Sequence, residues 1–295
     1  MNGNARVNSP VAWLQLMRAP AVFTAVSNLV AAHWLATGGN IEARALLLLT
    51  LSGLALYIGG MLLNDCFDQV VDAVERPGRP LPSGRVSPAA AWFVGWLCLG
   101  AGVLLAALQG RTSMLIAAAL AVAIVFYNRG TKSTWLGPVN MGLCRYLNWL
   151  LGLSVVGLTP AASLIALPIF FYVTSLTFVS RIEADASSPA PLIMAAGGFV
   201  LTAAAIGYLY LAGVLPNVAM PVLAGVGLVL VLTRIGKTWR AFTPMNAQAT
   251  VAFMIFGIIP LDALMLAGAG HSWAALALLS LLVPGRILGR WMYVT

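Results

Sequence analysis

Charged residues are scarce in this chain. Only 8% of its 295 residues are Asp, Glu, Lys or Arg, and just eight are acidic. In soluble domains roughly a quarter of the residues are charged, so this composition excludes an ordinary soluble fold. The mean hydropathy of +0.94 points the same way.

Cysteine and histidine are equally sparse. The chain has three cysteines and two histidines. Cys66, Cys98 and Cys144 show no paired spacing, and His33 and His271 stand alone. These patterns argue against a disulfide framework and against a Cys/His metal site.

Long apolar runs recur instead. Runs of about 20 residues are the length that a membrane-spanning helix requires. We place them at residues 13–36, 45–66, 88–108, 112–127, 136–158, 161–181, 190–212, 217–233, 246–267 and 272–288. The connections are short, so residues 1–295 are predicted to form a single all-α domain. The expected fold is a polytopic membrane bundle with nine transmembrane helices and a short C-terminal tenth.

The net charge of +8 comes from basic residues with an uneven distribution. With the N-terminus in the cytoplasm, thirteen of the 16 Lys and Arg residues fall on the cytoplasmic side, with Arg44 and Arg111 opposite. This positive-inside bias predicts an even number of spans in the cell inner membrane. Since the charges are scattered over loops, we expect membrane lipids and no nucleic acid as partners.

The acids gather after the second apolar run. Asp65, Asp68 and Asp72 are spaced i, i+3, i+7, which places them on one helix face. Like charges on one face repel unless cations lie among them, and Mg²⁺ is commonly held by carboxylates together with substrate phosphates. Three arginines follow: Arg76, Arg79 and Arg85. The alternative is that these residues only solvate a membrane loop; their helical spacing favours a Mg²⁺–diphosphate site.

Other polar residues fall in loops on the same side. Tyr127 ends the fourth apolar run and Lys132 follows it, and Ser180-Arg181 end the sixth. Because these loops lie at one depth, we expect them to meet at the mouth of one cavity.

The run N-D-x-x-D-x-x-x-D, followed by R-P-x-R-P-L-P-S-G-R-V-S, resembles the first signature of the UbiA superfamily of intramembrane prenyltransferases. The likeness extends to Arg18-Ala-Pro20, to the loop from Tyr127 to Lys132, and to a second acidic site about 120 residues after the first. It implies nine helices around a cytoplasm-facing cavity. It further implies two acidic sites that bind Mg²⁺ and the diphosphate of a polyprenyl donor, whose prenyl group passes to an aromatic or lipid-like acceptor.

The resemblance also implies residue roles. Asn64, Asp68 and Asp72 match the metal–diphosphate residues, with Asp65 beside them. The arginines Arg76, Arg79 and Arg85 match those of the family's next loop, and Lys132 the basic residue near the diphosphate. We assign catalytic roles to Asp68, Asp72 and Arg145, and substrate contacts also to the aromatic Tyr127 and Tyr172, since ring faces attract a carbocation.

The second acidic site departs from the family pattern. It reads S-R-I-E-A-D, with Arg181 at or next to the place of the leading acid and Glu183 and Asp185 left as metal ligands. Either Arg181 binds the diphosphate directly, or it pairs with one of these acids and the second metal site is lost.

The fifth apolar run contains a buried charge. An arginine inside a membrane costs about 2.5–3.5 kcal/mol on insertion scales, so Arg145 is expected to face the bundle interior. Arg145 and Asn148 form a polar strip at i and i+3 that either binds substrate or ties two helices together. This segment, with L-N-D-C-F-D and S-R-I-E, resembles the EboC-like branch of the superfamily.

Two functions remain open from sequence alone. The first is a Mg²⁺-dependent prenyltransferase, which the complete first motif favours. The second is a transport or lipid-handling protein that keeps the fold without catalysis, which the altered second site permits.

Overall fold

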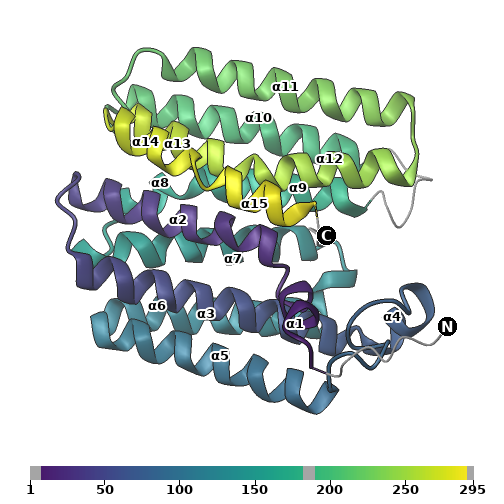
Figure 1. The fold of residues 1–295 in the computed structure, drawn as a ribbon. Helices are drawn as coiled ribbons and strands as arrows, with labels where there is room; N and C mark the ends of the chain where they lie inside the picture. The colour runs from purple at the N-terminus through teal and green to yellow at the C-terminus, as the bar shows by residue number, and fades with distance from the viewer. Residues whose placement is uncertain (1–7, 182–189, 291–295) are drawn as a thin grey trace.

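The chain is a bundle of helices. The computed structural model describes residues 8–181 and 190–290, apart from the side chains of Ala161 and Pro244. These residues form helices and no strand, and the long helices run alongside one another (Figure 1). The prediction of an all-helical membrane bundle is confirmed.

The helices follow the apolar runs closely. In chain order they are α1 (Pro10–Leu16), α2 (Ala19–Thr37), α3 (Ala43–Phe67), α4 (Gln69–Glu75), α5 (Pro88–Gln109), α6 (Arg111–Arg129), α7 (Gly137–Leu153), α8 (Pro160–Ile165), α9 (Leu167–Ser180), α10 (Ala190–Leu211), α11 (Met220–Arg240), α12 (Pro244–Phe256), α13 (Ile258–Gly268), α14 (Ser272–Leu279) and α15 (Leu282–Gly289), with short 3₁₀ turns after α6 and α7.

Three spans are broken by proline. The junctions α8–α9, α12–α13 and α14–α15 lie two to four residues before Pro168, Pro260 and Pro284. Proline lacks a backbone N–H and its ring crowds the carbonyl of residue i−4, so a helix kinks just before it. The two helices on either side of each junction still form one continuous apolar segment of the sequence.

The first span begins later than expected. We predicted one segment over residues 13–36, but the chain turns at Arg18, which adopts a left-handed conformation with φ of 48°. Pro20 lies in the first turn of α2, where its missing N–H removes no helical hydrogen bond. The turn separates α1 from α2 and sets Arg18 at the entrance to the span.

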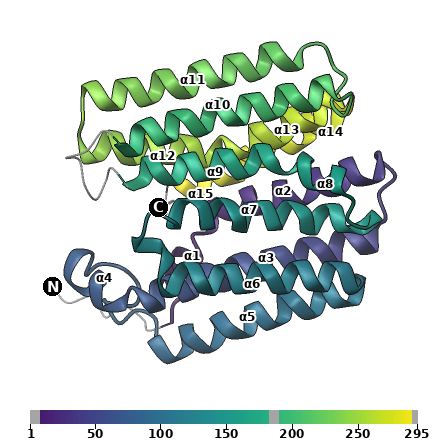
Figure 2. The same cartoon turned by 180° about the vertical axis from the view of Figure 1, so that it is seen from behind.

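Nine segments of the described residues are long and apolar enough to cross a membrane, and the last of them is Ser272–Gly289. The 17-residue α7, which carries Arg145, is shorter than these. It nevertheless lies beside α2, α6 and α9 and runs along the bundle with them (Figure 2). The described chain therefore contains the predicted C-terminal segment.

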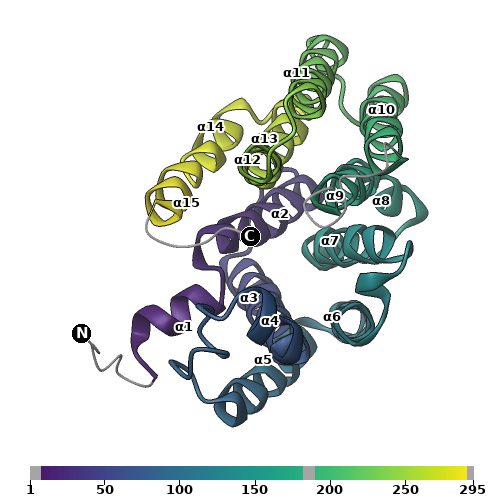
Figure 3. The same cartoon turned by 90° about the vertical axis from the view of Figure 1, so that its right-hand side faces the viewer.

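The polar loops share one end of the bundle. Figure 3 looks onto that end, where α4 lies over the end of α3. The start of α2 and the second half of α15 also meet there, since a side chain added at Gly285 would contact the carbonyl oxygen of Pro20 at 3.3 Å. An even number of crossings brings the α3–α5 loop and the end of α15 to the same end, as the charge distribution predicts.

Small residues let the helices approach closely. A Cβ atom on Gly59 of α3 would lie 2.8 Å from the carbonyl oxygen of Gly95 on α5. A Cβ atom on Gly152 of α7 would lie 2.8 Å from the carbonyl oxygen of Leu29 on α2. Membrane helices associate through such small-residue contacts because lipid supplies no hydrophobic drive between them.

Candidate active site: a polar mouth above a membrane cavity

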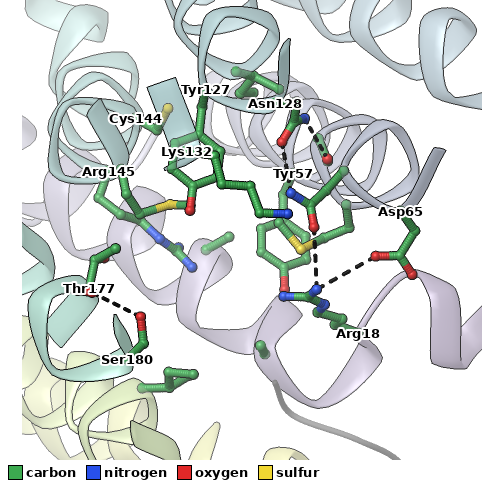
Figure 4. A pocket seen from close by; sticks show the side chains of 18 of the residues that line it. Arg18, Tyr57, Asp65, Tyr127, Asn128, Lys132, Cys144, Arg145, Thr177 and Ser180 are labelled. Carbon is green, nitrogen blue, oxygen red and sulfur yellow. Dashed lines mark hydrogen bonds and ion pairs between the residues drawn. The ribbon is translucent and has the colours of Figure 1, made fainter. Parts of the chain in front are cut away.

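A cavity of about 690 Å³ opens at the end of the bundle that carries α4. Its walls come from α1, α2, α3, α6, α7, α9, α12 and α13, together with the loops after α4 and α6. Its outer part holds charged side chains and its inner part is mostly apolar. Figure 4 shows Arg18, Tyr57, Lys132 and Arg145 extending from different parts of the chain into the same space.

The acidic run lies at this mouth. Asn64 and Asp65 form part of the last turn of α3, and Asp68 stands between α3 and α4. The backbone N–H of Asp68 still donates to the carbonyl of Asn64 at 3.1 Å, and that of Asp72 to Asp68 at 2.8 Å. The predicted helical spacing of the acids is therefore kept across the junction.

Each acid of the motif has a basic partner. Asp68 forms an ion pair with Lys132 from the loop after α6. Asp72 accepts a hydrogen bond from Arg79 at 2.7 Å, and Asp65 lies 3.7 Å from the same guanidinium. These contacts join three segments of the chain around the mouth.

The loop after α4 folds back over the mouth. Pro77 ends α4, and Gly84 supplies the left-handed turn (φ of 71°) that returns the chain towards α5. Leu81 and Val86 of this loop are buried. Arg76, Gly78, Arg79 and Pro80 then line the cavity.

Arg85 fixes this loop without lining the cavity. Its guanidinium donates to the side-chain oxygen of Gln15 on α1 at 2.8 Å and to the carbonyl of Gly78 at 2.8 Å. Gln15 and Gly78 do line the cavity. Arg85 was predicted to bind substrate, but in the structure it instead holds Gln15 and Gly78 at the mouth.

Two further residues, which the spacing of the acids did not indicate, contact the acidic run. Asn128 accepts a hydrogen bond from Asn64 at 3.0 Å and donates to the carbonyl of Gly60 at 3.1 Å. Arg18 lies 3.6 Å from Asp65 and donates to Asn64 at 3.4 Å. For both residues, the signal was their place at span ends on the motif's side of the membrane.

The inner end of the cavity contains Arg145. Its guanidinium donates to Thr24 at 2.9 Å and to Asn28 at 3.3 Å, both on α2, and stacks over the ring of Tyr57 at 5.6 Å. Asn148 also lines the cavity and donates to the carbonyl of Ala25 at 3.1 Å. The polar strip of α7 thus faces inward, and it both lines the cavity and ties α7 to α2.

Of the two tyrosines predicted to contact substrate, only one lines the cavity. Tyr127 lines the cavity, whereas Tyr172 is buried and donates its hydroxyl hydrogen bond to the carbonyl of Met254 at 2.9 Å. Glu183 and Asp185 lie outside the described residues.

Arg181 has partners on the loop after α6 within the described chain. Its guanidinium donates to the backbone carbonyls of Lys132, at 3.0 Å, and of Thr134. Partial burial lowers the pKa of this guanidinium below its ordinary value, and the carbonyls stabilise its charge. Arg181 therefore holds the loop that carries Lys132.

The donor set of the mouth suits a hard cation. No three acidic, His or Cys side chains of the described chain form a preformed metal cluster. Mg²⁺ does not require one, since it binds one or two carboxylates and completes its shell with water and substrate phosphates. Oδ1 of Asp65 is buried without a hydrogen-bond partner among the described residues. Such an unsatisfied oxygen, beside Asn64 and Asp68, fits an oxygen-ligated metal.

The chain is similar to known proteins in sequence. Residues 25–259 match the sequence model of the UbiA prenyltransferase family. A digeranylgeranylglyceryl phosphate synthase of Metallosphaera sedula is 38% identical over 95 residues, which cover 32% of this chain and 34% of that protein. The synthase of Methanopyrus kandleri is 36% identical over 123 residues, 42% of this chain and 45% of that protein. The matches thus span less than half the length of these relatives.

Solved structures share the fold. A structure of a digeranylgeranylglyceryl phosphate synthase has a TM-score of 0.69 at 19% identity, covering 88% of this chain and 98% of its own. A UbiA homologue from Archaeoglobus fulgidus, bound to GPP and Mg²⁺, also has a TM-score of 0.69, at 18% identity, covering 91% and 99%. At such identities the likeness concerns the fold.

Proposed function

Because this chain belongs to the UbiA prenyltransferase family, we propose that it is a Mg²⁺-dependent prenyltransferase of the membrane. It transfers a polyprenyl group from a polyprenyl diphosphate to an aromatic or lipid-like acceptor. The observation that carries the proposal is the charged mouth, with its Asp68–Lys132 and Asp72–Arg79 pairs, set above an apolar cavity.

The mouth supplies partners for a metal-bound diphosphate. Asn64, Asp65, Asp68 and Asp72 offer oxygen ligands, and Mg²⁺ there would stabilise the negative charge of the leaving diphosphate. Lys132 and Arg79 neutralise carboxylates in the described chain. When cations occupy those carboxylates, both side chains are free to turn towards phosphate oxygens, with Arg76 beside them at the cavity wall.

The interior excludes water from the reacting carbon. Leu120, Ile124, Val173, Leu176 and Val251 line the space beneath the mouth. An allylic carbocation formed there is protected from hydrolysis because few water molecules can enter. The rings of Tyr57 and Tyr127 also line this space, and their faces attract positive charge.

In this proposal, Arg145 and Asn148 bind the acceptor. Tyr57, over which Arg145 stacks, precedes Asn64 by seven residues of one helix, which corresponds to about 10 Å of depth. The diphosphate at the mouth and the guanidinium of Arg145 are thus separated along the cavity. An acceptor with a polar end fits between them, and the names of the curated relatives make a glyceryl phosphate lipid one candidate.

We further propose that the mouth faces the cytoplasm across the cell inner membrane, because the basic loops share its side. We also propose that the chain belongs to the EboC-like branch that its sequence resembles. This branch does not define the acceptor.

Prenyl transfer is tested directly with the purified protein in vesicles. Labelled geranyl and geranylgeranyl diphosphates are supplied with Mg²⁺ and either 4-hydroxybenzoate or geranylgeranylglyceryl phosphate, and products are identified by mass spectrometry. We expect a prenylated product and released pyrophosphate, both abolished by EDTA and restored by Mg²⁺. Donor binding without any pyrophosphate release, in the presence of membrane extract as acceptor source, would favour the lipid-handling alternative.

A further inference from the structure

Asp262 is a fully buried carboxylate inside the bundle. It lies on α13, three residues beyond the part of the chain that matches the family model, and is 0% exposed. Its oxygens accept hydrogen bonds from Ser27 at 2.5 Å, from Trp149 at 3.0 Å and from Asn28 at 2.8 and 3.0 Å. The donated hydrogen bonds stabilise the ionised form of this carboxylate, and an ionised carboxylate in the bundle interior also requires a compensating cation.

The compensating cation is Arg145, one side chain away. Among the described residues, no carboxylate lies within 4 Å of the Arg145 guanidinium. Asn28 connects the two charges, since its NH₂ group donates to Asp262 while its Oδ1 accepts from Arg145 at 3.3 Å. The network joins α2, α7 and α13.

The direction of the Asn28 amide follows from the two charges. An ionised carboxylate only accepts hydrogen bonds, and a guanidinium only donates them. The amide must therefore turn its NH₂ to Asp262 and its oxygen to Arg145. The opposite rotamer would place acceptor against acceptor on one side and donor against donor on the other.

Arg145 needs such a support because it stands in the cavity wall. Asn28 and Asp262 lie behind that wall and do not line the cavity, whereas Arg145 does. The guanidinium has five N–H donors, and two hydrogen bonds to described residues hold it against α2. This leaves further N–H groups of Arg145 to bind whatever occupies the inner cavity.

We propose that Asp262 positions Arg145 for the acceptor through the side-chain amide of Asn28. The inference rests on the proposed function, because it assumes that the inner cavity receives the acceptor. Asp262 itself contacts neither substrate. It fixes the polarity of the amide, and the amide fixes the guanidinium over Tyr57.

Three variants separate positioning from simple packing. Asp262→Asn keeps the shape but lets the amide of Asn28 turn round. The charge-swap variant, Asp262→Asn with Asn28→Asp, restores a directed network, since the carboxylate introduced on α2 accepts from both Arg145 and the amide introduced on α13. Ser27→Ala is the matched control, because it removes one hydrogen bond to Asp262 and leaves the Asn28 contacts in place.

The kinetic test uses whichever acceptor is prenylated in the assay above. Asp262→Asn should raise the acceptor KM about tenfold or more, the scale of a lost hydrogen bond to a charged group, with the donor KM within twofold. The swap should regain most of the loss, and Ser27→Ala should have a smaller effect than Asp262→Asn. Equal effects of Ser27→Ala and Asp262→Asn, or a folded swap that regains nothing, would overturn the proposal.

A second measurement does not depend on turnover. Phenylglyoxal modifies arginine side chains, and the extent of modification at Arg145 is read by mass spectrometry of its peptide. We expect faster modification in Asp262→Asn than in the wild type and the swap. Unchanged reactivity in Asp262→Asn would contradict positioning, even if no prenyl transfer is found and the proposed function fails. If Asp262→Asn alone does not fold, the swap decides, since it must fold and match the wild-type reactivity.

Discussion

Arg79 and Asp72 form an ion pair of 2.7 Å that closes the loop after α4 back onto the helix that carries the acid. The same guanidinium lies 3.7 Å from Asp65 in the last turn of α3. One arginine thus holds two acids of the motif and the loop that covers them. A metal–diphosphate that binds these acids has to rearrange this contact, which couples donor binding to the position of the loop.

Loss of the motif acids should abolish transfer without unfolding the protein. Asp68→Ala and Asp72→Ala each remove a proposed metal ligand, so pyrophosphate release at saturating Mg²⁺ should fall by about a hundredfold or more, as expected for lost electrostatic stabilisation. Glu75→Ala is the matched control, because Glu75 is an exposed acid of the same short helix. Wild-type turnover in either Asp variant would contradict the metal assignment.

The topology prediction is tested by labelling cysteines from each side of the membrane. On a background without the three native cysteines, Ser83→Cys and Arg290→Cys should react from the same side, because the α4 loop and the end of α15 share one end of the bundle. Ser272→Cys, at the start of α14, should react from the opposite side. Labelling of positions 272 and 290 from one side would show that the last segment does not cross.

Arg181 offers a test of loop anchoring. Arg181→Ala removes hydrogen bonds to two backbone carbonyls, so the free energy of unfolding should fall by about 1.5–3 kcal/mol. Donor affinity should also fall, since Lys132 loses its support. Arg181→Asp, which restores an acid at this place, should raise the Mg²⁺ requirement only if Arg181 binds the diphosphate directly. Thermal unfolding and donor titration on the same samples distinguish anchoring from phosphate binding.

The close contact of α3 with α5 predicts a cost for any added side chain. Gly59→Ala would set a methyl group 2.8 Å from the carbonyl oxygen of Gly95 and should destabilise the protein by about 1–3 kcal/mol. Gly100→Ala on α5 is the control, because no atom lies within 4 Å of its Cβ position. A melting temperature for Gly59→Ala equal to that of Gly100→Ala would show that the helices can separate at no cost.

Sequence periodicity was sufficient for most of the helices and for the position of the acids at the end of α3. Apolar runs locate spans because a helix must satisfy its backbone within the membrane, and the acids at helical spacing mark the end of α3. The turn at Arg18 was missed because a single charged residue lowers the mean hydropathy of a long apolar run only slightly, and the left-handed conformation of one residue leaves no mark in the sequence.

Contacts between distant spans could not be read from spacing. Asp262 was recognisable as an isolated acid in an apolar run, but nothing along the chain identified Asn28 and Trp149 as its partners. Tyr172 was grouped with cavity aromatics because sequence does not reveal which way a helix faces, and the structure buries it against Met254. The hydrogen bonds of Arg181 to the carbonyls of Lys132 and Thr134 also join two distant parts of the chain, and no spacing indicates them.

The wide separation of Arg145 and Asp262 along the chain has a consequence for how the protein is made. A ribosome that adds about 5–20 residues per second needs roughly 5–25 s to reach Asp262 after it has synthesised Arg145. During that interval α7 must enter the bilayer with its countercharge still missing. The described partners of the guanidinium that have already been synthesised are Thr24 and Asn28 of α2 and the ring of Tyr57 on α3. Nascent α2 would then act as an internal chaperone for α7. Truncated chains ending before α13 should therefore insert α7 efficiently, and removal of the α2 partners by Thr24→Val with Asn28→Leu should leave α7 outside the membrane in glycosylation mapping.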